Sequence, residues 1–375
     1  MTAPDLPPGA TGVITVDLDV IAANWHAITA LVTPAECGAV VKADAYGLGA
    51  LKVIPALARA GCRTFFVATP DEAEAARRLA PDARLFALDG LLPGAAGVFA
   101  ANDVAPVLTS LEEIAVWSAE AARAQKRLPA GLQIDSGLNR LGLSDADVHT
   151  LASEPTRLDG IDLRLVMSHL ACADDPTHGH NETQRSNFDR LRALLPPTPA
   201  SLAASDGLML GARFHYDLVR PGYALYGGQA FQGGPTPVRP AVIVEARVLQ
   251  VRALAPGDPV GYSATWRAAR PTRLAVISAG YADGFARALS AGAGEERGVV
   301  AIHGQRAPIV GRVSMDLVTA DVTDVTADVA PGDLATLVGP GLTIEAMGHA
   351  AGTIGYEVLT RLGPRFVRRY LGGAG

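Results

Sequence analysis

The stretch A-V-V-K-A-D-A-Y-G-L-G at residues 39–49 joins an apolar run, a lysine and a loop punctuated by glycines. The apolar run predicts a buried strand that ends at Lys42. Lysine is rare in this chain, occurring only as Lys42, Lys52 and Lys126, whereas arginine is abundant. A desolvated lysine can lose its proton and form a Schiff base, which arginine cannot do. Lys42 is therefore a candidate for amine chemistry, the alternative being a side chain that merely extends from the strand end into water.

Length and composition narrow the class of protein. The 375 residues carry a formal net charge of −6, with 49% hydrophobic and 19% charged residues. The length favours two or three domains, and the acidic balance argues against a nucleic-acid surface. The three cysteines, Cys37, Cys62 and Cys172, have no C-x-x-C spacing, which fits a reducing compartment. We find no signal-peptide pattern and no apolar run long enough to span a bilayer, so we expect a cytoplasmic protein without membrane or nucleic-acid partners.

Apolar runs of strand length alternate with helical patterns in the first two thirds of the chain. The runs are apolar on both sides, as in a parallel sheet covered by helices. About eight such units fit either a (β/α)₈ barrel or an open doubly wound sheet. The predicted strands lie near 37–42, 64–69, 83–88, 104–109, 131–135, 162–168, 200–204 and 217–220, and the predicted helices at 18–31, 50–60, 71–79, 111–125, 145–153 and 182–195; residues 94–101 could be helix or loop.

The last third of the chain has a different pattern, in which strand-like segments predominate. A Gly- and Pro-rich stretch at 229–240 is the best linker, and it is followed by strand-like segments at 242–251, 273–278, 298–303, 308–313, 319–322 and 334–338. Two helices are expected at 343–350 and 354–362. The sequence therefore predicts an α/β domain at 12–236 and a second, mostly antiparallel β domain at 237–375.

Seven motifs in order along the chain resemble one family. The run V-V-K-A-D-A-Y-G-L-G is joined by I-D-S-G-L-N-R-L-G (134–142), S-H-L-A (168–171), D-L-V-R-P-G-Y-A-L-Y-G (217–227), G-Y-A-D-G (280–284), P-I-V-G-R-V-S-M-D (308–316) and G-Y-E-V (355–358). Together they resemble the alanine racemases, which use pyridoxal 5'-phosphate. The resemblance favours the (β/α)₈ TIM-type barrel over the open sheet and implies interconversion of L- and D-alanine.

The resemblance also implies two catalytic bases. Lys42 would form the Schiff base with pyridoxal phosphate and then serve one face of the α-carbon. Tyr281, in G-Y-A-D-G, would serve the other face and would come from the partner subunit of a homodimer. A tyrosine with its ordinary pKa of about 10 needs cationic neighbours to act as a base near neutral pH. His169 and Arg220 match the residues that supply them.

The remaining site residues also follow from the resemblance. Arg220 would face the pyridine nitrogen and keep it unprotonated, because arginine does not give up its proton. The substrate carboxylate would meet Arg140 and the backbone amide of Met315. The residues that would hold the phosphate are Tyr46, Ser205, Tyr356 and the backbone amides of Gly222 and Tyr223.

Four positions depart from the family pattern. Gln133 stands where many members have a lysine that becomes carbamylated and steadies the active-site arginine, so we expect an inorganic anion or a water beside Arg140. Ala204 replaces an asparagine, which removes a side chain from the cofactor's surroundings. Ser314 replaces a frequent cysteine and Gly355 a frequent asparagine, and we have no account of these two.

Other functions remain open at this point. A racemase of another small amino acid such as serine would use the same residues. A decarboxylase on the same architecture would lack the tyrosine of G-Y-A-D-G, and a non-catalytic cofactor-binding protein would need no second domain. The cluster His169, Asp174, Asp175, His178 and His180 could suggest a metal hydrolase, but its spacing matches no metal-binding motif, and we predict no metal. D-Alanine for the cell wall and alanine catabolism are both compatible roles.

Overall fold

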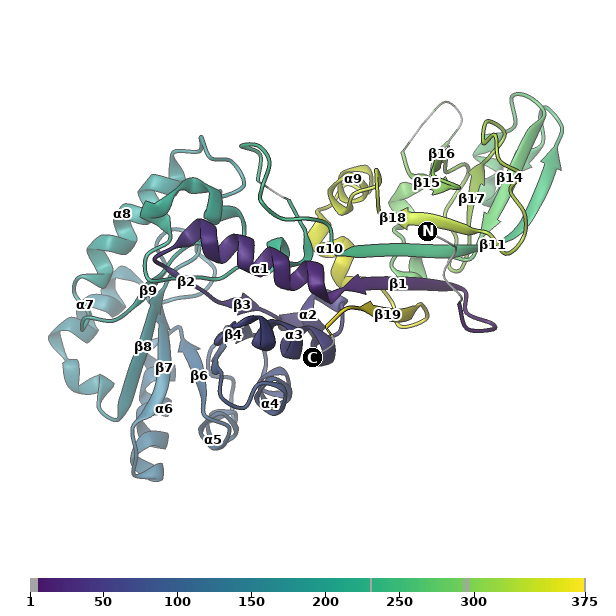
Figure 1. The fold of residues 1–375 in the computed structure, drawn as a ribbon. Coiled ribbons are helices and arrows are strands. Elements are labelled where there is room, and N and C mark those ends of the chain that lie inside the picture. The colour runs from purple at the N-terminus through teal and green to yellow at the C-terminus, as the bar shows by residue number, and fades with distance from the viewer. Residues whose placement is uncertain (1–5, 230, 293, 295–296, 374–375) are drawn as a thin grey trace. The chain divides into compact units, whose positions relative to one another are not determined.

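A computed structural model describes residues 6–229, 231–292, 294 and 297–373. The contacts divide the chain into two compact units. Residues 19–239 form one, which we call the barrel unit, and residues 1–18 together with 240–374 form the other, the β unit. Figure 1 labels the elements of both.

The barrel unit is built on parallel strands. Seven of them pair in chain order from β3 to β9. The strands are β2 (Glu36–Cys37), β3 (Ala39–Val40), β4 (Thr64–Val67), β5 (Arg84–Ala87), β6 (Val104–Leu108), β7 (Leu128–Gln133), β8 (Ile161–Met167), β9 (Ala200–Ser201) and β10 (Leu218–Val219). Most of these residues are buried on both faces, as the sequence predicted.

Backbone hydrogen bonds close this sheet into a barrel. On one side of β10, Arg220 N–H donates to Ala203 O at 3.0 Å. On its other side, Gly38 N–H donates to Val219 O at 3.0 Å and Val40 N–H donates to Pro221 O at 2.8 Å. Because β2 and β3 continue one another across Gly38, the strands occupy eight positions around the barrel. The predicted (β/α)₈ barrel is confirmed over the open sheet.

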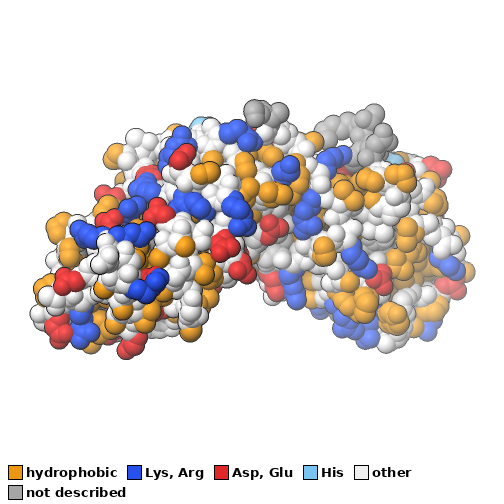
Figure 2. All heavy atoms as spheres, turned by 90° about the horizontal axis from the view of Figure 1, so that it is seen from below, with side chains coloured by type: hydrophobic (Ala, Val, Ile, Leu, Met, Phe, Trp, Pro, Cys, Tyr) orange, Lys and Arg blue, Asp and Glu red, His pale blue; other side chains and the backbone are white. Residues whose placement is uncertain are grey.

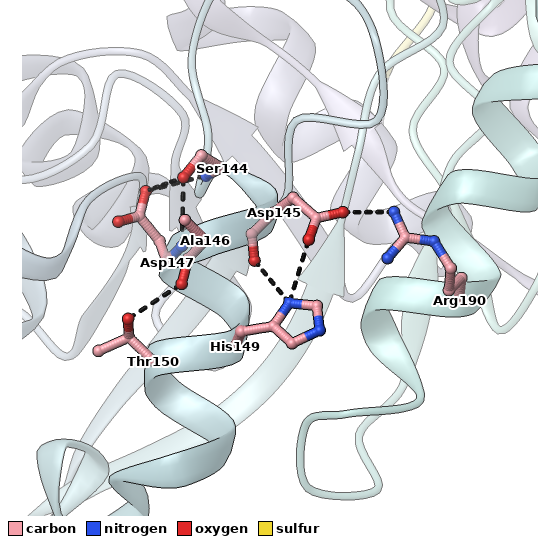
Figure 3. A network of polar contacts seen from close by, with 7 residues as sticks. All are labelled: Ser144, Asp145, Ala146, Asp147, His149, Thr150 and Arg190. Atoms are coloured by element: carbon pink, nitrogen blue, oxygen red, sulfur yellow. Dashed lines mark hydrogen bonds and ion pairs between the residues drawn. The ribbon is translucent and has the colours of Figure 1, made fainter.

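Helices follow the strands around the outside of the barrel unit (Figure 1). They are α1 (Leu18–Val32), α2 (Lys42–Gly47), α3 (Ala50–Ala60), α4 (Pro70–Leu79), α5 (Ala96–Ala101), α6 (Leu111–Ala124), α7 (Asp145–Ser153) and α8 (His180–Arg192). Side-chain caps fix several starts. Ser144 begins α7 with a reciprocal cap, in which its Oγ accepts from Asp147 N–H at 3.2 Å and Asp147 Oδ2 accepts from Ser144 N–H at 2.9 Å (Figure 3). Arg190 of α8 then pairs with Asp145 and ties the two helices together.

The β unit contains a sheet of mostly antiparallel strands. They are β11 (Val242–Leu254), β14 (Thr272–Ile277), β15 (Val299–Ile302), β16 (Gln305–Pro308), β17 (Val318–Asp321) and β18 (Leu334–Val338), with the short pair β12 (Pro259–Val260) and β13 (Trp266–Arg267) beside them. Two helices, α9 (Ile344–Ala350) and α10 (Gly355–Thr360), precede the last strand, β19 (Val367–Leu371).

The first strand of the chain also belongs to the β unit. β1 (Gly12–Asp17) pairs antiparallel with β11 and parallel with β19. Val16, for example, lies opposite Val242 on one side and Tyr370 on the other. The sequence predicts a barrel domain from residue 12 with its boundary at 236/237, whereas the contacts divide the chain at 18/19 and 239/240. The partners of β1 lie more than 200 residues further along the chain, so the sequence of β1 alone does not indicate them.

One smaller expectation also differs from the structure. The strand expected at 308–313 lies earlier, at β16, and residues 309–313 form only isolated bridges. The ambiguous stretch 94–101 contains the helix α5.

No helix in the described part of the chain combines the length and apolar character needed to cross a membrane. On the face shown in Figure 2, basic and acidic side chains lie interspersed.

Candidate active site

Lys42 stands at the carboxyl end of the first barrel strand and begins an unusual turn. The four residues after it, Ala43 to Tyr46, all have left-handed backbone angles, with φ between 52° and 59°. For residues other than glycine this conformation costs roughly 1–2 kcal/mol each. The half-buried Lys42 amine has no hydrogen bond or ion pair among the described residues. The turn is therefore strained, and it places a lysine whose amine is not engaged by another described residue.

Two carboxylates hold this turn. Glu72, in the first turn of α4, accepts from Ala43 N–H with one oxygen and from Ala68 N–H with the other, each at 2.7 Å. Asp44 Oδ1 accepts from Ala50 N–H at 2.7 Å, at the start of α3. Sequence reasoning missed Glu72, although the spacing of Thr69 and Glu72 has the form of a helix-capping motif.

Arg220 is buried beside His169. Its Nη2 donates to Ser168 O at 2.8 Å and lies 3.4 Å from His169 Nδ1, and its Nη1 donates to Ser201 Oγ at 2.5 Å. Since a guanidinium only donates, His169 Nδ1 must accept, and the neutral ring then carries its proton on Nε2. The Nε–H of Arg220 has no acceptor among the described residues.

The electrostatics of this corner keep His169 neutral. Burial, followed by the positive charges of Arg220, Arg140 and Lys42, lowers the pKa of His169 to about 3. Burial also lowers the pKa of Arg220, to about 9, which leaves the guanidinium charged at neutral pH. The structure thus brings Lys42, Arg140 and Arg220 within electrostatic reach of His169. In a barrel, the residues at the carboxyl ends of the strands lie at the same face.

Ser205, Gly222 and Tyr46 meet at the neighbouring strand ends. Ser205 Oγ accepts from the N–H groups of Gly222 at 3.0 Å and Ala224 at 3.1 Å. Its own O–H has no acceptor among the described residues. A Cβ on Gly222 would lie 2.3 Å from the Tyr46 hydroxyl, so the two groups approach closely. Tyr223, the other amide expected here, is fully buried in the short helix Tyr223–Tyr226.

Arg140 lies in a loop that Asp135 organises. Asp135 Oδ1 accepts from three successive backbone N–H groups, those of Gly137, Leu138 and Asn139, at 2.9–3.1 Å. Arg140 is exposed, with no hydrogen bond or ion pair among the described residues. The side chain of Gln133 is buried and donates to Leu141 O at 2.8 Å. An anion or water beside Arg140 stays a prediction.

Tyr281 and Met315 lie side by side in the β unit. Tyr281 N–H donates to Ser314 O at 3.1 Å, and Ala282 N–H donates to Met315 O at 3.0 Å. Both side chains are largely exposed, at 44% and 53%. The N–H of Met315 has no acceptor among the described residues, so it can donate to a ligand oxygen.

The other expected residues fall as follows. Tyr356 is partly buried near the start of α10, also in the β unit. In the histidine and aspartate cluster, Asp175 caps Thr177 and His180 Nε2 contacts Gly137 O at 2.9 Å. Within the described residues no three side chains of metal-ligating type gather into a group.

Known proteins match this chain over nearly its full length. The family model described as alanine racemase, N-terminal domain, matches residues 16–230, and the model of the C-terminal domain matches residues 241–370. The chain belongs to the alanine racemase family. An alanine racemase of Acidiphilium cryptum is 50% identical over 95% of this chain and 97% of its own length. Two enzymes of Agrobacterium fabrum, described as catabolic and biosynthetic alanine racemases, are 45% and 44% identical over 97% and 96% of this chain and 93% of their own lengths.

A solved structure of this family is also similar. The alanine racemase of Bartonella henselae, a crystal structure with covalently bound pyridoxal phosphate, is 41% identical. It aligns with a TM-score of 0.92 over 96% of this chain and all of its own. This alanine racemase fold therefore extends over both units of the chain.

Proposed function

We propose that this protein interconverts L- and D-alanine with pyridoxal 5'-phosphate as its cofactor. The observation that carries the proposal is the amine of Lys42, held without a partner on a strained turn at a barrel strand end. A purely structural lysine would not need such a turn. Membership of the alanine racemase family supports the choice of alanine and of the cofactor.

The described residues fit this cofactor. A phosphate needs hydrogen-bond donors, and the Ser205 O–H lacks an acceptor while the Tyr46 hydroxyl lies against Gly222. Backbone amides of Gly222 and Tyr223 and the hydroxyl of Tyr356 complete the proposed set. When bound, the cofactor supplies an electron-poor ring that spreads the negative charge left after an α-proton is removed.

Arg220 sets the character of that ring. Its Nε–H has no acceptor among the described residues, and it is the donor that we assign to the pyridine nitrogen. Because the guanidinium stays charged at neutral pH, it would leave the pyridine nitrogen of a bound cofactor unprotonated. The ring would then be a weaker electron sink, which would favour simple proton return over side reactions such as transamination. His169 is neutral, and its Nδ1 accepts a hydrogen bond from Arg220.

Two bases exchange the proton in this proposal. The Lys42 amine takes or returns it on one face of the α-carbon, and the Tyr281 hydroxyl does so on the other. Arg140 and the N–H of Met315 bind the substrate carboxylate, an assignment supported by the absence of other partners for them among the described residues. Tyr281 and Met315 act on the barrel site of a second subunit, so the functional form is a homodimer in the cytoplasm. The enzyme either supplies D-alanine for cell-wall synthesis or takes part in alanine catabolism.

Proton exchange tests the proposal directly. The purified protein is incubated with pyridoxal phosphate and L-alanine in D₂O, while NMR follows the α-proton and a chiral assay follows the product. We expect loss of the α-proton together with appearance of D-alanine. In Tyr281→Phe, racemisation should be nearly abolished while the cofactor stays bound. Normal racemisation by this variant would show that Tyr281 is not the second base.

A further inference from the structure

The loop that carries Tyr281 has little regular structure of its own. It is a single short helical turn, Tyr281–Asp283, between Gly280 and Gly284. A Cβ on Gly280 would lie 2.2 Å from Met315 O, and one on Gly284 would lie 2.2 Å from Arg361 O. The loop is thus pressed between the segment of Met315 and the segment that follows α10. Backbone hydrogen bonds join the three segments, from Ala282 N–H to Met315 O and from Gly363 N–H to Asp283 O, both at 3.0 Å.

The side chain of Arg365 joins these segments. It forms a two-pronged pair with Asp283, with Nε to Oδ1 and Nη2 to Oδ2 both at 2.7 Å. Its Nη1 donates to Asp316 Oδ1 at 2.6 Å, so the residue after Met315 is bound as well. Asp283 is nearly fully buried, and its Oδ2 also accepts from Gly280 N–H at 2.9 Å. One guanidinium therefore fixes the residues that flank both Tyr281 and Met315.

We propose that Arg365 is a positioning residue for the racemisation, holding the second base Tyr281 in place against the Met315 segment. The proposal rests on the role assigned above to Tyr281. Its physical basis is that a planar guanidinium can hold one carboxylate with two parallel hydrogen bonds and a second carboxylate with its remaining N–H groups, whereas a lysine lacks this rigid fork. The hydrogen bonds from Arg365 to Asp283 and Asp316 raise the pKa of Arg365, so the link stays charged throughout an enzyme assay.

The arrangement predicts an effect on one base and not on the other. Without Arg365, the Asp283 carboxylate keeps one hydrogen bond among the described residues, from Gly280 N–H. The loop is then held by its backbone hydrogen bonds alone and can shift. A displacement of about 1 Å at a reacting group can lower a rate on the order of 100-fold. Lys42 lies in the barrel unit on its own anchors, Glu72 and Asp44, and does not depend on Arg365.

The test measures exchange of the α-proton in D₂O from L-alanine and from D-alanine separately, in Arg365→Met. Tyr281→Phe in the same assay identifies the enantiomer whose proton Tyr281 removes. For that enantiomer we expect exchange to fall roughly 100-fold in Arg365→Met, with exchange of the other retained within about threefold. Arg270→Met is the matched control, since Arg270 pairs with Asp324 elsewhere in the same unit. Its exchange rates should equal those of the parent protein.

Each outcome decides the proposal. Equal loss for both enantiomers, or no loss, would overturn it even where Tyr281→Phe shows the expected selectivity. If Tyr281→Phe itself shows no selectivity, the second base is misassigned and the proposal falls with the proposed function. Cofactor absorbance and circular dichroism report whether Arg365→Met folds. Should it not fold, Asp316→Ala removes only the exposed arm of the link, and a smaller loss with the same selectivity is required. Arg365→Lys keeps the positive charge without the planar guanidinium. Its exchange rate should lie between those of Arg365→Met and the parent protein.

Discussion

Replacing Gly222 with alanine tests the close approach between this backbone and Tyr46. The added Cβ would lie 2.3 Å from the Tyr46 hydroxyl oxygen, 2.9 Å from its Cζ and 3.1 Å from Val40 Cβ. The hydroxyl must retreat by about 1 Å to reach ordinary van der Waals contact. Val40 is buried in a barrel strand and cannot yield, so the movement falls on Tyr46.

The surroundings of Tyr46 set the size of the effect. Its ring is 8% exposed and lies against Tyr226 with 5.0 Å between the ring centres. Forcing one extra carbon into packing of this kind costs about 1–3 kcal/mol. If Tyr46 must return to its original place to hold the cofactor phosphate, this cost falls on binding, and affinity for pyridoxal phosphate should weaken by roughly 5- to 150-fold.

The assay is a titration of the apoprotein with pyridoxal phosphate, followed by cofactor absorbance. Gly97→Ala serves as the control, because a Cβ at this position in α5 meets nothing within 4 Å. That change should leave affinity unaltered and stabilise the helix by about 0.5–1 kcal/mol. An unchanged dissociation constant for Gly222→Ala would refute the reasoning, since it would mean that the phosphate site lies elsewhere or that Tyr46 moves freely.

Two further predictions concern Lys42 and His169. Lys42→Ala should abolish the covalent link to the cofactor, so borohydride reduction followed by mass spectrometry should find no adduct. His169 has its pKa lowered from 6.5 to about 3 in the folded protein, so between these values the unfolded chain binds more protons. The unfolding free energy of the apoprotein should therefore fall as pH decreases through this window. Denaturant titrations of His169→Gln should show a flatter dependence, and an equally steep one would contradict the neutral assignment.

Local signals were enough to predict many elements of the barrel unit. The helices expected at 50–60 and 145–153 have those bounds in the structure, because apolar spacing and, for the second, the cap at Ser144 are encoded within a few residues. The parallel character of the sheet also follows from runs that are apolar on both faces. The closure of the barrel does not, since it depends on hydrogen bonds between β10 and segments near the start of the chain.

The turn after Lys42 shows the limit of local reasoning at the site. Ala43, Ala45 and Tyr46 have no intrinsic preference for left-handed angles. They adopt them because Glu72 and Asp44 bind backbone groups on either side of the turn, and Glu72 arrives from another helix. The position of Lys42 at a strand end was predictable from its sequence, whereas the strain that presents it was not. Arg365 escaped notice for the same reason, as its partners lie at 283 and 316.

The pairing of β1 has a consequence for synthesis of the protein on the ribosome. The barrel unit is one uninterrupted run of chain, so its strands can all be paired before β11 has been made. During that time β1 lacks its partner β11, so Val16 is not yet paired with Val242. The unpaired strand is an open edge that could pair with another chain. Its second side is covered only after β19 has been translated. The β unit, although it contains β1, is therefore completed only after the whole barrel unit has been made.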